Sequence, residues 1–227
     1  MSVKNKVFAA AAALTVAGGL GAVVPLSASA ATPQCGKACV QIFSKEFGTA
    51  ASPGFVESVF RGIPHAGVPT ILQRTSTSNP AGDMIIPDKG PISHFYAEGM
   101  VSAAANRHYG ADTGVQVEYA PYGVPSGLCA AIATRAPYQN EGLTLQKCST
   151  PGTTVFVIDT PASSAPGYFP IVLASTRDFT HPFTMTFPGN ADPAHRLFPQ
   201  IKVQHLRGNP THVPDDQLWG ADNPPVS

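Results

Sequence analysis

The feature that most constrains this chain is an internal repeat in its C-terminal half. Residues 143–148 form an alternating segment, and a short Pro/Gly turn and the apolar residues 155–156 follow it. Residues 201–206 have the same alternation, and a Pro-containing turn and then residues 218–219 follow them. A unit of this size cannot bury its apolar face alone, so its copies are expected to pack around one shared core.

A third, degenerate copy is expected within residues 40–101, where Ile85-Ile86 and Phe95-Tyr96 would take the equivalent places. Three such copies predict an all-β closed barrel with pseudo-threefold symmetry. The three repeats would span roughly residues 38–110, 111–165 and 166–224.

Strand patterns dominate the rest of the sequence. Apolar residues alternate with polar ones in four segments, and this period of two places one face of a strand in a core. These segments are residues 115–119, 143–146, 183–187 and 201–204. Residues 155–158 and 169–173 are unbroken apolar runs, as expected of strands that are buried on both faces. Within residues 94–109 only a short helical turn is expected, because Gly99 interrupts an alanine-rich segment.

The first thirty residues have the pattern of a secretion signal. Lys4 and Lys6 give a positive start, residues 7–24 form an apolar run, and residues 28–30 are small, as signal peptidase requires. An uncleaved membrane anchor is the alternative, because a run of this length is near the lower limit of a membrane span. We expect a signal peptide over residues 1–30, a single domain over residues 31–227, and secretion of the mature protein.

All four cysteines follow the signal, and an even number in an exported chain predicts two disulfide bonds. The sequence allows three pairings of Cys35, Cys39, Cys129 and Cys148. We favour Cys35 with Cys39 and Cys129 with Cys148, because each cysteine then reaches its partner through a short loop. A redox or metal role for the first pair is disfavoured, because three residues rather than two separate its thiols.

Charge and motif spacing exclude several classes of function. With 14 basic and 14 acidic residues the formal charge is zero, which argues against a nucleic acid or an anionic membrane as partner. Ser126 does not have the spacing of a nucleophile elbow, and the seven histidines show no compact metal motif. One local group of ligand-like residues is interpreted as a solvated loop; it consists of His205, His212, Asp215 and Asp216. No catalytic residue, metal or cofactor is therefore expected.

Several short motifs resemble those of the ricin B-type β-trefoil lectins. Residues 127–129 (Gly-Leu-Cys), 145–148 (Leu-Gln-Lys-Cys) and 217–219 (Gln-Leu-Trp) resemble the Gly-x-Cys-Leu, second-cysteine and Gln-x-Trp elements of that family's repeats. The resemblance covers residues 110–222. The whole mature chain is also similar to a group of secreted actinobacterial proteins without an assigned activity. The resemblance implies that the barrel is a β-trefoil-like closed barrel of three degenerate repeats.

The sequence departs from that family at the residues that bind sugar. Such lectins hold a sugar with an Asp after the first cysteine, an aromatic residue before the second, and an Asn before Gln-x-Trp. The corresponding residues here are Ala131, Gln146 and Thr153 in one repeat and Met185, Gln204 and Asp216 in the last. The acidic acceptor and the stacking ring are thus missing. Trp219 and Phe156 are expected to be structural core.

These observations favour a secreted, non-catalytic binding module for a glycan or a cell-envelope component. Its contact surface would be the Pro-rich loops around Tyr122, Tyr138 and His212. A secreted protease inhibitor and an uncharacterised extracellular hydrolase are the alternatives, because a fold alone does not fix a function. The expected partner is an unidentified extracellular carbohydrate or protein, and the expected state is a monomer. The sequence identifies no ligand-binding residue.

Overall fold

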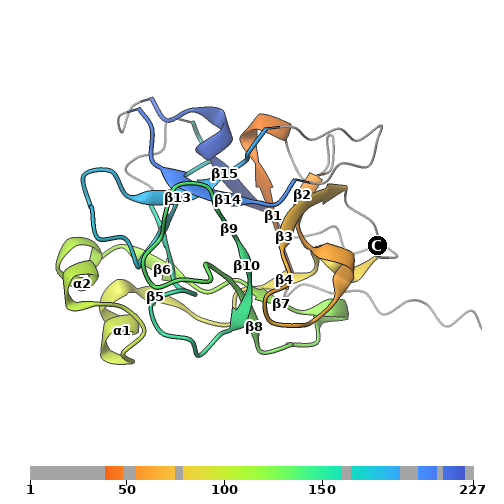
Figure 1. The fold of residues 1–227 in the computed structure, drawn as a ribbon, viewed down its shortest axis with the longest axis horizontal. Helices are drawn as coiled ribbons and strands as arrows, with labels where there is room; N and C mark the ends of the chain where they lie inside the picture. Colours follow the sequence, from red (N-terminus) through yellow and green to blue (C-terminus); the bar gives the residue numbers. More distant parts are fainter. Residues whose placement is uncertain are drawn as a thin grey trace, which may run out of the picture. The chain divides into compact units, whose positions relative to one another are not determined.

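The computed structural model describes residues 39–48, 55–74, 79–159, 165–189, 199–208 and 212–222, all within a unit that spans Thr32–Ser227. The predicted signal peptide over residues 1–30 lies outside the described residues. Figure 1 shows a mostly β structure with two short helices, α1 (Ile92–Ala97) and α2 (Ala103–Tyr109). The strands are β1 (Cys39–Ser44), β2 (Phe55–Val59), β3 (Thr70–Arg74), β4 (Met84–Ile85), β5 (Lys89–Pro91), β6 (Thr113–Val115), β7 (Glu118–Tyr119), β8 (Leu128–Ala131), β9 (Glu141–Gly142), β10 (Thr144–Lys147), β11 (Phe156–Ile158), β12 (Ile171–Leu173), β13 (Phe183–Thr186), β14 (Lys202–His205) and β15 (Trp219–Asp222).

Strands from the two ends of each repeat form a closed barrel. β1 pairs with β4, and β4 pairs with β7. β6, which directly precedes β7 in the same stretch of chain, pairs with β11. β11 then pairs with β12, a bridge between Phe169 and Trp219 leads to β15, and β15 returns to β1. All of these pairings are antiparallel. A barrel that closes in this way leaves no sheet edge among its strands.

Three further strand pairs complete the three repeats, one pair in each. They are β2 with β3, β8 with β10, and β13 with β14. Each repeat therefore contributes two barrel strands and one such pair, which is the β-trefoil arrangement. The all-β, β-trefoil-like fold predicted from the sequence is confirmed.

A ring of backbone hydrogen bonds joins the three repeats. The amide of Thr70 donates to the carbonyl of Leu143 over 3.0 Å, Leu143 donates to Ile201 over 2.8 Å, and Ile201 donates to Thr70 over 3.0 Å. Because each residue makes the same two bonds to its neighbours, the three positions are equivalent under the pseudo-threefold symmetry.

This ring corrects the expected position of the first copy of the repeat. The true counterpart of residues 143–147 and 201–205 is β3, whose sequence Thr-Ile-Leu-Gln-Arg shares an apolar-Gln-basic ending with Leu-Thr-Leu-Gln-Lys and Ile-Lys-Val-Gln-His. Phe95 and Tyr96 were expected at an equivalent place, and that expectation is wrong. They lie on α1, in the connection between β4 and β6.

The segment expected to hold one helical turn contains both α1 and α2. Gly99 lies between them with φ +74°, a left-handed conformation that ends α1 at little steric cost. The side chain of Ser102 then caps α2 by accepting from the amide of Ala105. Ile92 and Phe95 pack in a second small core beside the barrel. Within the described ranges no helix is long and apolar enough to cross a membrane.

The alternation in residues 115–119 predicts polar side chains at the surface, and this is wrong for Gln116 and Glu118. Both are buried. The Gln116 amide donates to the carbonyl of Cys148 over 2.7 Å, and a Glu118 carboxylate oxygen accepts from the amide of Gly127. Backbone groups next to the β8–β10 pair, at Gly127 and Cys148, therefore satisfy these two buried side chains.

Cys129 and Cys148 form a disulfide bond, which ties β8 to the residue that follows β10. The backbone supports the same link, because the Cys148 amide donates to the carbonyl of Gly127 over 3.0 Å. Cys39 is also disulfide-bonded. The other member of the predicted pair, Cys35, lies outside the described residues, so the pairing of Cys35 with Cys39 stays a prediction.

The core is mostly apolar, and Trp219 and Phe156 are both fully buried in it. Strand register makes them equivalent to Met84 of the first repeat. The indole of Trp219 donates to the carbonyl of Met185 over 2.8 Å, so burial leaves no polar atom of that ring unpaired.

The first repeat places polar groups where the other two have apolar ones. Ser44, Glu57 and Thr70 are buried, and their side-chain oxygens have no hydrogen-bond partner among the described residues. The counterparts of Ser44 are Tyr119 and Leu173, those of Glu57 are Ala130 and Met185, and those of Thr70 are Leu143 and Ile201. At these three positions the core of the first repeat is therefore less apolar than that of the other two.

Burial raises the pKa of Glu57 from its usual 4.5 to about 7. Its carboxyl group binds a proton more tightly in the folded state than in the unfolded chain. The free energy of unfolding should therefore fall as the pH rises through this interval, by about 3 kcal/mol in total.

We predict that Glu57→Gln removes this pH dependence, because the amide does not titrate. Glu57→Met introduces the residue of the third repeat and should raise the free energy of unfolding at about pH 8 by about 2–3 kcal/mol. Urea unfolding at several pH values measures both effects. The exposed Glu46 gives the control, since Glu46→Gln should keep the pH dependence of the parent. An unchanged slope in Glu57→Gln would contradict the prediction.

Candidate functional site

The residues that the sequence suggested for a contact surface lie on three separate loops. Tyr122 and Tyr138 are 37% and 58% exposed, and His212 is exposed just before the last 3-10 turn. Tyr138 lies between β8 and β9, and Tyr122 lies between β7 and β8. Of the three, only Tyr122 adjoins the hollow that is the candidate site.

The suggested ligand-like group near the C-terminus does not converge on one point. A ring nitrogen of His205 lies 2.6 Å from the carbonyl of His181, and the ring packs on Phe183. Asp215 forms an ion pair with Lys45 over 2.5 Å, and Asp216 forms one with Arg207. Separate partners therefore hold these three side chains. His205 lies on β14, and the two aspartates lie on the 3-10 turn η6 (Asp215–Gln217), so the group is not one solvated loop.

A polar hollow lies on the first repeat, between β1, the β2–β3 pair and the 3-10 turn η4 (Pro80–Gly82). Its cavity volume is about 10 Å³, which is room for about one water molecule. Three side-chain amides, a hydroxyl, a guanidinium and a carboxyl group line it. The lining residues are Gln41, Val56, Ser58, Gln73, Arg74, Asn79, Ala81, Gly82 and Asp83.

The pseudo-symmetry explains why the hollow belongs to the first repeat. In the third repeat the amide of Gln217 donates to the Thr186 hydroxyl and to the carbonyl of His205, and so links two strands. The residue at the corresponding place, two positions before Met84, is Gly82. A Cβ atom there would lie 3.0 Å from a methyl group of Val56, so the backbone of η4 packs directly on β2. No side chain from η4 covers the neighbouring polar groups.

The charged groups of the hollow are held in place by their neighbours. The guanidinium of Arg74 lies over the ring of Phe55, 5.6 Å from its centroid, a favourable cation–π geometry. A carboxylate oxygen of Asp83 accepts from the amide of Tyr122 over 2.9 Å. Burial raises the pKa of Asp83, and this hydrogen bond partly opposes the rise. Asn79 accepts from the amide of Ala81, which fixes the start of η4.

An apolar rim adjoins the hollow; it consists of Phe60, Ile63, Tyr122 and Val124, all exposed. These residues lie on or directly after the turns η3 (Phe60–Gly62) and η5 (Pro121–Gly123), which both pack against η4. The hydroxyl of Tyr119 donates to the carbonyl of Gly62 over 3.1 Å and fixes η3 to the barrel. Burial, followed by the nearby Asp83, raises the pKa of this phenol to about 12, so it remains a donor at neutral pH.

Both turns of the rim hold a non-glycine residue in the left-handed region. Arg61 has φ 58° and Tyr122 has φ 55°. Such a conformation costs a side chain about 1 kcal/mol, and residues of this kind cluster at functional sites. Aromatic surface beside a group of hydrogen-bonding side chains is suited to a ligand with hydroxyl groups and an apolar face.

Asp83 is the only carboxyl group among the nine residues that line the hollow. Hydrolysis of a glycosidic bond generally requires two carboxyl groups that face each other across the substrate. The lining of the hollow therefore holds one carboxyl group, where such hydrolysis uses two.

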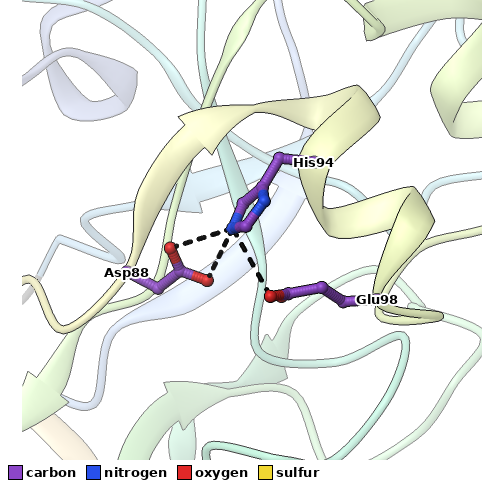
Figure 2. A group of neighbouring side chains, drawn as sticks. All are labelled: Asp88, His94 and Glu98. Atoms are coloured by element: carbon purple, nitrogen blue, oxygen red, sulfur yellow. Dashed lines mark hydrogen bonds and ion pairs between the residues drawn. The ribbon is translucent and has the colours of Figure 1, made fainter.

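Asp88, His94 and Glu98 form a second group of polar side chains, in the connection between β4 and β6 (Figure 2). Their types could hold a metal ion. Sequence reasoning missed this group, because the histidines were judged by linear motifs alone. The spacing of His94 and Glu98, four residues apart on a helix, was the available signal.

Comparisons with known proteins support the fold of this chain. No protein-family model and no curated protein matches the sequence. Among solved structures, the designed 3-fold symmetric protein ThreeFoil is similar, with a TM-score of 0.52 and 10% sequence identity. The alignment covers 81% of this chain and 97% of ThreeFoil. The likeness supports the β-trefoil fold.

We predict that Arg61→Gly raises the free energy of unfolding by about 0.5–1 kcal/mol, because glycine adopts the left-handed conformation without strain. Arg61→Ala is the matched control. It removes the same side chain and keeps the strain, so it should not stabilise the protein. Thermal unfolding of both variants measures the difference. Equal stability of the glycine and alanine variants would show that the backbone of η3 is unstrained.

Proposed function

We propose that this protein is a secreted, non-catalytic binding module that holds a neutral glycan of a cell envelope in the hollow of its first repeat. The observation that carries the proposal is the composition of that hollow. Amide, hydroxyl and guanidinium groups converge there beside an apolar rim that includes an aromatic ring.

The hydrogen-bonding capacity of the hollow matches the hydroxyl groups of a sugar. Gln41, Gln73 and Asn79 each carry an amide that can both donate and accept, while Arg74 can only donate and an ionised Asp83 can only accept. With one cation and one acid the lining has no net charge, which favours a neutral ligand over an anionic one. Tyr122 supplies a ring against which the apolar face of a sugar can pack, whereas the guanidinium of Arg61 lies over the ring of Phe60.

The site differs in position from the one that the ricin B-type resemblance implied. The residues compared with lectin sugar contacts lie in the second and third repeats, and Ala131 is buried there. Gln146 donates to Thr144 of its own strand, and Gln204 donates to Asn140. The first repeat retains an open group of polar side chains instead.

Export is the second part of the proposal. Lys4 and Lys6, the apolar run after them and the small residues at 28–30 support a cleaved secretion signal. The Cys129–Cys148 disulfide bond suits an oxidising compartment outside the cytoplasm. Expression of the full chain followed by N-terminal sequencing of the released protein tests this part, and a product that begins near residue 31 is expected.

The pseudo-symmetry supplies matched variants for the binding test. Gln73→Ala and Arg74→Ala change the lining of the hollow, whereas Gln146→Ala and Lys147→Ala change the equivalent residues of the second repeat. We predict that the first pair lowers affinity for the bound glycan about tenfold or more, as the loss of one or two hydrogen bonds implies. The second pair should bind as the parent does.

A glycan array that includes envelope polysaccharides identifies the ligand, and calorimetry with the selected oligosaccharide measures each variant. Failure to bind any glycan, or an equal loss of affinity in both pairs of variants, would contradict the proposal. Circular dichroism of all four variants checks that each retains the fold of the parent.

A further inference from the structure

Asp88, His94 and Glu98 come together through the folding of the connection between β4 and β6. The carbonyl of Asp88 accepts from the amide of Gln116 over 3.0 Å, which fixes this residue at the start of β5. The amide of Ile92 donates to the carbonyl of Asp112 over 2.9 Å and anchors the start of α1. Ile92 is buried, so α1 has its apolar face against the domain. His94 and Glu98 lie four residues apart on its exposed side.

The ring of His94 is positioned by its surroundings. A Cβ atom at Gly90 would lie 3.1 Å from the ring, so the imidazole packs against the backbone of β5. It also meets the ring of Phe95 edge to face, with centroids 5.2 Å apart. These contacts leave Nε2 directed at the carboxylate of Asp88 (Figure 2).

The separations of the polar atoms match the edges of a metal coordination sphere. Nε2 of His94 lies 3.2 and 3.3 Å from the two oxygens of Asp88 and 3.6 Å from an oxygen of Glu98. One ligand atom from each residue can be chosen so that all lie within 4.8 Å of one another. Ligands about 2.1 Å from a tetrahedral Zn²⁺ ion are separated from one another by about 3.4 Å, so small rotations of the carboxylates would complete the geometry.

The ligand types narrow the choice of ion. One imidazole nitrogen with two carboxylate oxygens suits a first-row transition metal, and Zn²⁺ most of all, whereas Ca²⁺ and Mg²⁺ prefer oxygen ligands throughout. The side chains of Asp88, His94 and Glu98 are 30%, 41% and 48% exposed. Solvent can therefore reach an ion held among them and supply its remaining ligand.

We propose that Asp88, His94 and Glu98 form a binding site for a single Zn²⁺ ion. The ion joins the start of β5 to the end of α1 and keeps one coordination position open to water. A salt bridge between a protonated His94 and the two carboxylates is the competing explanation of the same distances, and it requires no ion.

Equilibrium dialysis of the untagged mature protein against ZnCl₂ tests the site, with metal content measured by atomic emission. One zinc ion for each chain is expected. His94→Ala, Asp88→Asn and Glu98→Gln should each weaken binding about tenfold or more, since even the outer partners of metal ligands change affinity by that factor. Co²⁺ serves as the spectroscopic probe, and its visible absorption should show an imidazole ligand that His94→Ala removes.

The exposed pair Asp178 and His181 is the matched control, because its ring and carboxylate lie 3.6 Å apart and no third ligand joins them among the residues that the structure describes. His181→Ala should bind zinc as the parent does. Thermal unfolding gives an independent measurement, in which ZnCl₂ should stabilise the parent and His181→Ala but not His94→Ala. Absence of zinc binding by the parent, or equal binding by the His94→Ala variant, would overturn the proposal and favour the salt bridge.

Discussion

The fold depends on the ring of three backbone hydrogen bonds that links Thr70, Leu143 and Ile201. Each bond joins a different pair of repeats, so the ring fixes the register of all three strand pairs at once. The bonds join main-chain atoms, so they can form whatever the side chain at each position. The three equivalent positions accordingly hold a threonine, a leucine and an isoleucine. The repeats can therefore diverge in sequence while their arrangement is kept.

That tolerance explains how the buried Glu57 and both candidate sites can lie in or just after the first repeat. The second and third repeats have apolar residues at the positions of Ser44, Glu57 and Thr70, and Gln217 links two strands of the third. The first repeat instead buries Glu57 and has Gly82 at the position of Gln217. The longer connection that carries α1 and α2 follows it.

Much of the fold could be predicted because strand alternation survives at residues 143–146 and 201–204. The first copy was misplaced because Thr70 replaces an apolar residue there, although the Leu-Gln-Arg ending of β3 was visible in the sequence. Burial of Gln116 could not be predicted, since the carbonyl that accepts from it belongs to Cys148, 32 residues further along the chain and just after β10. The two candidate sites could not be predicted from the sequence either. Their residues are brought together by turns, and the approach of Asp88 to His94 requires the pairing of β5 with β6.

The backbone ring also determines when the protein can fold. Its members are separated by long stretches of chain, so the ring cannot close until the chain has been made as far as Ile201. Folds dominated by such distant contacts form slowly. The first two repeats therefore depend on the third to complete their own backbone pairing, and neither is expected to be stable before the third has folded.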